Sequence, residues 1–160
     1  MARIYKLCVI RPIVLSDVQL VYEIECRNFP TPWNKSIFEA IATWGGKIRF
    51  QNHRVLLMRV LESEHKLVGY IVWEENKIAK KGHIMNLAVS EEYRRRGWGE
   101  KLLRYALDMM RAGKMLFCVL EVRESNLSAQ KLYEKIGMKK KERIEDYYEQ
   151  EDAILYYLSL

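Results

Sequence analysis

The sequence predicts an α/β protein with a mixed sheet, on two observations. Strand-like and helix-like stretches alternate through the middle of the chain, and pairs of strand-like stretches that can form hairpins lie toward each end. The chain has 160 residues and no linker rich in proline, glycine or serine, so we expect one domain over residues 1–160.

Capping and breaking residues mark the elements in the first third of the chain. Ser16 and Asp17 are good helix caps before an apolar periodic stretch, and Pro30 and Pro32 cannot continue that helix because proline lacks an amide donor. The expected elements are a strand over residues 4–10, a helix over about 17–27, a second helix over about 35–43, and a loop from Gly45 to residue 53.

The remaining elements follow from the spacing of apolar side chains. Gly137 marks the carboxyl end of the last helix, since glycine favours the left-handed cap position. The expected elements are a hairpin of residues 55–61 with 67–73, strands over 83–89 and 115–122, helices over about 98–112 and 126–136, and two last strands over 138–144 and 153–158.

Composition limits the class of protein. Hydrophobic residues make up 49% of the chain and charged residues 30%, which is typical of a soluble globular protein. The sequence shows no signal peptide and no apolar run of membrane length, so we expect no membrane partner. Three cysteines at no metal-binding spacing indicate reduced thiols, a cytoplasmic location and no metal.

The net charge of +6 is distributed unevenly along the chain. Arginines cluster at residues 94–96 and lysines at 139–141, whereas residues 142–152 are predominantly acidic. This distribution suits a protein that holds an anion in one place and a cation in another, but the acidic segment is equally typical of a solvated loop. The basic charge permits binding to RNA or the ribosome, although no recognised RNA-binding signature occurs and direct binding is not expected.

The segment around Gly97 predicts a phosphate site. An apolar strand ends at Val89, a turn carries Arg94–Arg96 into Gly97-x-Gly99, and an amphipathic helix begins at once. Glycines at a helix start let several backbone N–H groups point at one spot, where the helix dipole and the arginines attract an anion. Spacing excludes a Walker loop and a dinucleotide fingerprint, which leaves an ordinary strand–turn–helix with solvated arginines as the alternative.

These residues resemble a known family. Arg94-x-x-Gly97-x-Gly99 is similar to the Arg/Gln-x-x-Gly-x-Gly/Ala motif of the GNAT superfamily of acetyl-CoA-dependent N-acetyltransferases. The stretch from Leu120 to Tyr133 narrows the resemblance to the ribosomal-protein alanine and archaeal N-terminal acetyltransferases. The resemblance implies a mixed, mostly antiparallel sheet of about seven strands with four flanking helices. It also implies that the central strands, here residues 83–89 and 115–122, splay apart to admit acetyl-CoA.

The same resemblance assigns residues to an acetyl-CoA site. The pyrophosphate is expected on the backbone amides at the helix start, and the pantetheine arm beside the preceding strand. Asn126 is expected to contact the cofactor, although a role as helix cap also explains an asparagine there. The residues assigned to acetyl-CoA are Leu87, Ala88, Val89, Arg94, Arg95, Arg96, Gly97, Trp98, Gly99, Glu100 and Asn126.

Glu121 is a carboxylate near the end of an otherwise apolar strand. Burial raises a carboxyl pKa toward neutrality, as a general base for an amine requires, but an ion pair with Arg123 on the same strand face also explains the residue. Residues 120–126 are similar to the group's Leu-Glu-Val-Arg-x-Ser-Asn, in which the glutamate of the bacterial ribosomal-protein enzyme is the catalytic base. The resemblance therefore implies that Glu121 is the general base.

Tyr133 has two interpretations. Beside Leu132 and Ile136 it fits a core aromatic on one helix face. Residues 132–137 resemble the family's Leu-Tyr-Glu-x-x-Gly, in which the tyrosine protonates the departing thiolate, so the resemblance implies that Tyr133 is the general acid. Cys118 falls on the strand face opposite Glu121 and has no histidine nearby in sequence, so we expect direct attack by the amine without a covalent acyl-enzyme.

Two segments, residues 28–33 and 147–152, resemble the walls of the family's amine entrance. The residues assigned to the substrate site are Phe29, Trp33, Tyr147 and Tyr148. The expected substrate is the α-amine of a protein or peptide N-terminus, with a ribosomal protein as a candidate partner and a monomer or homodimer as the assembly. The short acidic segment 149–152 keeps lysine ε-amines and polyamines open as substrates. An acetyl-CoA-sensing or ribosome-binding module is the non-enzymatic alternative.

Overall fold

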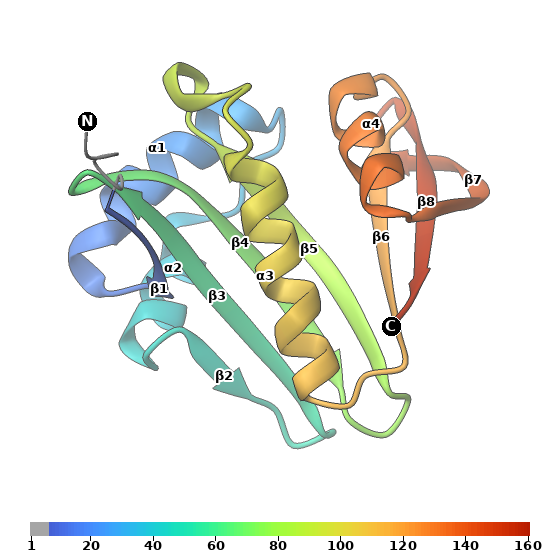
Figure 1. Ribbon diagram of the computed structural model, residues 1–160, viewed down its shortest axis with the longest axis horizontal. Helices are drawn as coiled ribbons and strands as arrows, with labels where there is room; N and C mark the ends of the chain where they lie inside the picture. The colour runs from blue at the N-terminus through green and yellow to red at the C-terminus, as the bar shows by residue number, and fades with distance from the viewer. Residues whose placement is uncertain (1–6) are drawn as a thin grey trace, which may run out of the picture.

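The computed structural model describes residues 7–160, which form one sheet with helices on both faces (Figure 1). The strands are β1 (Cys8–Pro12), β2 (Lys47–Arg49), β3 (Arg54–Ser63), β4 (Lys66–Asn76), β5 (Lys81–Val89), β6 (Phe117–Arg123), β7 (Lys139–Tyr148) and β8 (Glu151–Ser159). The helices are α1 (Val18–Asn28), α2 (Lys35–Thr43), α3 (Trp98–Ala112) and α4 (Leu127–Ile136), and short 3-10 turns cover Leu15–Asp17 and Glu91–Tyr93. None of the helices in this part of the chain is long and apolar enough to span a membrane.

The sheet has the strand order β1-β3-β4-β5-β6-β8-β7, and β2 pairs with β3 beside this path. Among residues 7–160, β5 and β6 are the parallel pair and the other paired strands are antiparallel. The predicted mixed, mostly antiparallel sheet with four helices is therefore confirmed.

The sheet has eight strands because β2 lies within the segment that we expected to be a loop. Gly45 and Gly46 have positive φ angles of 67° and 75°, and they turn the chain after α2 so that Lys47–Arg49 pairs with Val55–Leu57 of β3. Three residues with one apolar side chain give no alternating pattern for the sequence to reveal. The predicted first strand, residues 4–10, falls partly outside the described residues, and its residues 8–10 belong to β1.

The two faces of the sheet bury separate clusters of apolar side chains. In β4, Tyr70 and Val72 pack with α1 and α2, whereas Ile71 and Trp73 pack with α3, because successive residues of a strand point to opposite faces. All four side chains are fully buried. Burial on both faces explains the near-continuous apolar sequence of β4 and identifies it as a central strand of the sheet.

The strands β5 and β6 separate after three residue pairs, from Lys81–Phe117 to His83–Val119. Beyond them, β5 remains paired with β4 and β6 remains paired with β8, so the facing edges of residues 84–89 and 120–123 are not joined to each other. The register shift opposite Val72 and Trp73 makes Met85 an extra residue in β5, and such a bulge bends a strand. The two ribbons diverge visibly in Figure 1, which confirms the predicted splay.

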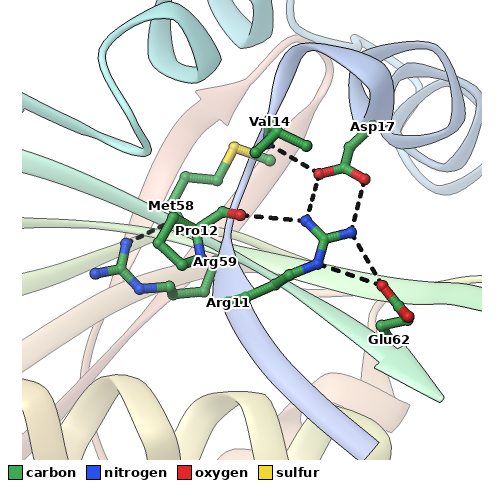
Figure 2. A network of polar contacts seen from close by, with 7 residues as sticks. All are labelled: Arg11, Pro12, Val14, Asp17, Met58, Arg59 and Glu62. Carbon is green, nitrogen blue, oxygen red and sulfur yellow. Dashed lines mark hydrogen bonds and ion pairs between the residues drawn. The ribbon is translucent and has the colours of Figure 1, made fainter. Parts of the chain in front are cut away.

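A polar network fixes β1 and the turn before α1 to β3 (Figure 2). The Arg11 guanidinium donates two hydrogen bonds to Asp17, at 2.7 and 2.9 Å, and two to Glu62, at 3.1 and 3.3 Å. Asp17 also accepts a 2.9 Å hydrogen bond from the Val14 amide, so its carboxylate turns back toward the strand and does not cap α1 as we had expected. Burial raises the pKa of Asp17, but the hydrogen bonds from Arg11 and Val14 outweigh it, and the pKa lies below its usual value.

The Asp17 network predicts a pH-dependent contribution to stability. A lowered pKa in the folded state means that Asp17 stabilises the fold above its unfolded pKa of about 4 and loses this contribution as the pH falls through the folded value. Asp17→Asn should therefore lower the free energy of unfolding by about 1 to 3 kcal/mol at neutral pH and by less at acid pH. Urea unfolding at several pH values measures the difference from wild type. Asp108→Asn removes an exposed ion pair on α3 and serves as the control; a constant difference for Asp17→Asn at all pH values would contradict the prediction.

Candidate active site

Two cavities open where β5 and β6 diverge. The first, of about 320 Å³, lies between the two strands and is bounded by the segment 29–33, by α4 and by Tyr147 and Tyr148. The second, of about 440 Å³, lies at the start of α3 and against α4. Ala129 of α4 lines both cavities, so the two adjoin.

Glu121 of β6 and His83 of β5 both line the first cavity, where their side chains are in contact. The His83 Nε2 atom lies 2.6 Å from the Glu121 Oε2 atom, and both side chains are partly exposed. Arg123, the partner that the alternative interpretation gave to Glu121, instead pairs with Glu151 at 3.1 Å and lies over the ring of Tyr148. The carboxylate is thus held by an imidazole at the point where the sheet opens.

The expectation that the pKa of Glu121 is raised is wrong. Burial does raise it, but the hydrogen bond and the charge of His83 outweigh burial, so the pKa lies below its usual value. No sequence pattern indicated an imidazole there, because His83 is 38 positions away from Glu121. The available signal was weak: a histidine at the start of an apolar strand that was already expected to border the cofactor.

Tyr133 of α4 belongs to the core and to the first cavity at once. Its ring packs edge-on against Tyr156 with centroids 5.6 Å apart, and 7% of its surface is exposed. Burial, and to a lesser extent Tyr148, raises the pKa of Tyr133, so the phenol keeps its proton at neutral pH. The two interpretations of Tyr133 are therefore compatible.

The second cavity surrounds the glycine turn that the sequence singled out. Gly97 is the residue before α3 and has a φ of 83°, a left-handed conformation in which glycine is unstrained. Because α3 begins at Trp98, the amides of residues 98–100 have no carbonyl partner in a preceding turn of helix. The predicted cofactor residues that line this cavity are Val89, Arg94, Arg95, Gly97, Trp98, Gly99 and Glu100.

Four predicted cofactor residues lie elsewhere. Leu87 and Asn126 line the first cavity, and Asn126 caps α4 by accepting a 3.1 Å hydrogen bond from the Ala129 amide. Ala88 packs with the core cluster beneath α1 and α2, and the Arg96 guanidinium lies over the Tyr93 ring, 5.5 Å from its centroid, so neither side chain lines a cavity. The side chains of these two residues therefore lie outside the second cavity, where the cofactor is expected.

Arg94 makes a contact that the sequence could not indicate. Its guanidinium donates a 2.7 Å hydrogen bond to the Asn28 side chain at the end of α1 and a 3.3 Å hydrogen bond to the Val89 carbonyl. Arg94 therefore connects the turn before α3 with α1. Two lysines of α4, Lys131 and Lys135, also line the second cavity and were missed, because they lie in a different helix from the glycine turn.

All four predicted substrate residues, Phe29, Trp33, Tyr147 and Tyr148, line the first cavity. The Tyr148 hydroxyl donates a 3.3 Å hydrogen bond to the Glu121 carbonyl, and the Tyr147 and Tyr148 rings pack edge-on. Burial, helped by Tyr147 and Glu121, raises the pKa of Tyr148 to about 12. The 29–33 segment and the β7–β8 turn thus form two walls of one cavity. Their spacing in the sequence alone could not establish this arrangement.

The acidic segment is partly neutralised by internal partners. Glu151 pairs with Arg123 at 3.1 Å and accepts a 2.8 Å hydrogen bond from the Ser125 amide. Asp152 pairs with Arg143 at 2.6 Å. Two carboxylates at the start of β8 are therefore paired with arginines of the same chain.

A parallel strand pair that opens around a carboxylate, beside a glycine turn at a helix start, is the architecture of an acetyltransferase. Residues 18–138 match the sequence model of the Acetyltransferase (GNAT) family, and the chain belongs to that family. The resemblance predicted from the sequence is therefore confirmed.

Three named proteins are similar to this chain. The chain is 31% identical over 154 residues to a protein of Bacillus subtilis named putative ribosomal protein bS18-alanine N-acetyltransferase, which covers 94% of this chain and 95% of that protein. It is 38% identical over 111 residues to an N-alpha-acetyltransferase of Sulfurisphaera tokodaii, over 60% of this chain and 65% of that one. The crystal structure of the ribosomal-protein-S18-alanine N-acetyltransferase of Escherichia coli superimposes with a TM-score of 0.78 at 25% identity, covering 96% of this chain and 94% of that one.

The Glu121–His83 contact predicts the titration of the carboxyl group. His83→Ala removes the hydrogen bond and the charge that lower the pKa of Glu121, whereas the burial that raises it remains. The pKa of Glu121 should therefore rise above the wild-type value. Carbon-13 NMR of the labelled side-chain carboxyl, titrated from about pH 3 to pH 8, measures it. His65→Ala removes an exposed imidazole and should leave the titration unchanged. An unchanged pKa in His83→Ala would show that the pair does not persist in solution.

Proposed function

We propose that this protein transfers the acetyl group of acetyl-CoA to the α-amine of protein or peptide N-termini. The observation that carries the proposal is that Glu121, His83 and Tyr133 all line the first cavity, which adjoins the second cavity at the start of α3. The names of the relatives from Bacillus subtilis and Sulfurisphaera tokodaii support an acceptor of this kind.

The second cavity has the chemistry that the diphosphate of acetyl-CoA requires. The free amides of residues 98–100 and the dipole of α3 attract an anion, and Arg95 and Lys131 add positive charge around them, whereas Lys135 pairs with Glu100 at 2.6 Å. The open edge of β5 offers backbone groups to the amides of an extended arm, as it would to an added strand. Acetyl-CoA supplies the acetyl thioester, and the remaining contributions come from the chain.

The Glu121–His83 pair is proposed to take the proton of the incoming amine. The lowered pKa keeps Glu121 ionised at neutral pH, so its carboxylate can accept a proton, and the His83 Nε2 atom lies 2.6 Å from its Oε2 atom. Transfer of one proton from the ammonium group of the substrate to the carboxylate leaves a neutral carboxyl group and a neutral amine. The amine is then free to attack the thioester.

Tyr133 is proposed to give its proton to the thiolate of the departing CoA. Its raised pKa keeps the phenol protonated until the thiolate forms. Cys118 does not compete as a nucleophile, because burial raises the pKa of its thiol to about 12 and its side chain is fully buried. Direct attack by the amine therefore fits the site better than a covalent acyl-enzyme.

A lysine side chain or a polyamine is the second candidate acceptor, because the β7–β8 turn is acidic. The pairing of Glu151 with Arg123 and of Asp152 with Arg143 reduces the negative charge that such a cation would meet. The 29–33 and β7–β8 walls supply aromatic side chains instead, which suit the first residues of a peptide. These contacts favour the N-terminal acceptor.

Release of CoA from acetyl-CoA with three amine sources tests the proposal. The amines are a peptide with a free N-terminus, an N-blocked peptide containing lysine, and spermidine. Turnover is expected with the free N-terminus, and Glu121→Gln and Tyr133→Phe should each lower kcat by about 100-fold or more, because each removes one proton-transfer group. Asp108→Asn, far from both cavities, is the control with unchanged turnover.

Two other outcomes of this experiment would contradict the proposal. Turnover confined to the blocked peptide or to spermidine would replace the N-terminal acceptor with a side-chain or polyamine amine. Binding of acetyl-CoA without turnover of any amine would support a cofactor-sensing module instead of an enzyme.

A further inference from the structure

Glu25, in the last turns of α1, is a fully buried carboxylate that lines the first cavity. Its Oε1 atom accepts a 2.8 Å hydrogen bond from the Trp33 amide, and both oxygens lie 3.1 Å from the Asn86 Nδ2 atom. Its Oε2 atom accepts a hydrogen bond from the Tyr70 hydroxyl. Within residues 7–160, the ion pairs do not include Glu25, so neutral donors alone compensate for its burial.

The three donors belong to three different parts of the fold. Trp33 ends the segment 29–33 that forms one wall of the cavity, Asn86 follows the bulge in β5, and Tyr70 lies in β4. A buried carboxylate is costly unless its hydrogen-bonding capacity is satisfied, and here it is satisfied by joining the cavity wall to the sheet. His83 lies on the same strand as Asn86, so Glu25 also connects the wall to the strand that carries the hydrogen-bond partner of Glu121.

The segment 29–33 packs Phe29 and Trp33 against the core but makes few backbone hydrogen bonds. Pro30 and Pro32 have no amide hydrogen, so they cannot donate to the rest of the protein. The Phe29 amide donates a 3.0 Å hydrogen bond to the Glu25 carbonyl, and the Trp33 amide donates to the Glu25 carboxylate. Among the described residues, both backbone-amide hydrogen bonds of this segment thus end on Glu25, one at each end of the segment.

We propose that Glu25 is the positioning residue of the acceptor site: its carboxylate fixes the segment 29–33 against β5 and thereby sets the opening through which the amine enters. This inference rests on the proposed function for its kinetic consequence, but the structural consequence is independent of it. Both oxygens of Glu25 are occupied by protein donors, so the residue acts through the wall and does not itself take a proton from the substrate.

Two substitutions separate the hydrogen bonds of Glu25 from its size. Glu25→Ala leaves the donors of Trp33, Asn86 and Tyr70 without an acceptor, so the wall should loosen. Glu25→Gln keeps one carbonyl oxygen for the Trp33 amide, while its NH2 group can donate to the Tyr70 hydroxyl. Glu25→Met, of similar length and without an acceptor, replaces Glu25→Ala if the alanine variant does not fold.

The kinetic test compares the Michaelis constants of the two substrates. Glu25→Ala should raise the KM for the free-N-terminus peptide roughly 10-fold, as loss of a buried charged hydrogen bond does, and should leave the KM for acetyl-CoA within about 2-fold. Glu25→Gln should restore most of the peptide KM. Glu75→Ala is the matched control: Glu75 is another buried carboxylate, bonded to Trp73 and Lys77 at the far end of β4, and it lines neither cavity. It should leave both KM values unchanged.

The structural test uses amide hydrogen exchange of the protein without substrates. Residues 29–34 should exchange faster in Glu25→Ala than in wild type or Glu25→Gln, while exchange over α3 stays the same. Unchanged exchange of residues 29–34, or an equal rise of both KM values, would overturn the positioning role. Faster exchange in a protein that acetylates no amine would support the positioning role and reject the proposed function.

Discussion

The separation of β5 from β6 after three residue pairs is the constraint on which the rest of the structure depends. Each strand is held on its outer side, β5 by β4 and β6 by β8, so the gap persists without contacts across it. The cavity that contains Glu121, His83 and Tyr133 exists because backbone groups that would otherwise join the two strands are left unpaired. Unpaired backbone groups are costly where water is excluded, and an extended substrate that supplies the missing partners removes that cost.

Charge is distributed along the gap in a way that suits its two proposed occupants. The second cavity, at the start of α3, combines free amides with Arg95 and Lys131, whereas the first cavity contains the carboxylate of Glu121. This carboxylate is held by His83, so an ammonium group meets negative charge that is already oriented. An anion and a cation are thus directed to opposite ends of one path.

The sequence predicted what depends on local pattern. Helices, strands and the glycine turn at Gly97 follow from spacing and capping. The resemblance to the family assigned residues 28–33 and 147–152 to the amine entrance, and Phe29, Trp33, Tyr147 and Tyr148 line the first cavity. The sequence could not predict what depends on three-dimensional neighbours. His83 reaches Glu121 only because β5 and β6 are adjacent, and that contact reverses the expected direction of the Glu121 pKa. Arg94 was assigned to phosphate from its motif, but no pattern indicated its hydrogen bond to Asn28.

The walls of the cavity lie outside the strands β4, β5, β6 and β8, whose pairing holds the gap open. The segment 29–33 connects two helices, and Tyr147 and Tyr148 lie by the turn that joins the two strands farthest from β1. Their side chains can therefore vary over evolution without disturbing the pairing that holds the gap open. A single scaffold of this kind can give rise to descendants with different acceptors while the cofactor groove and the proton-transfer groups stay the same.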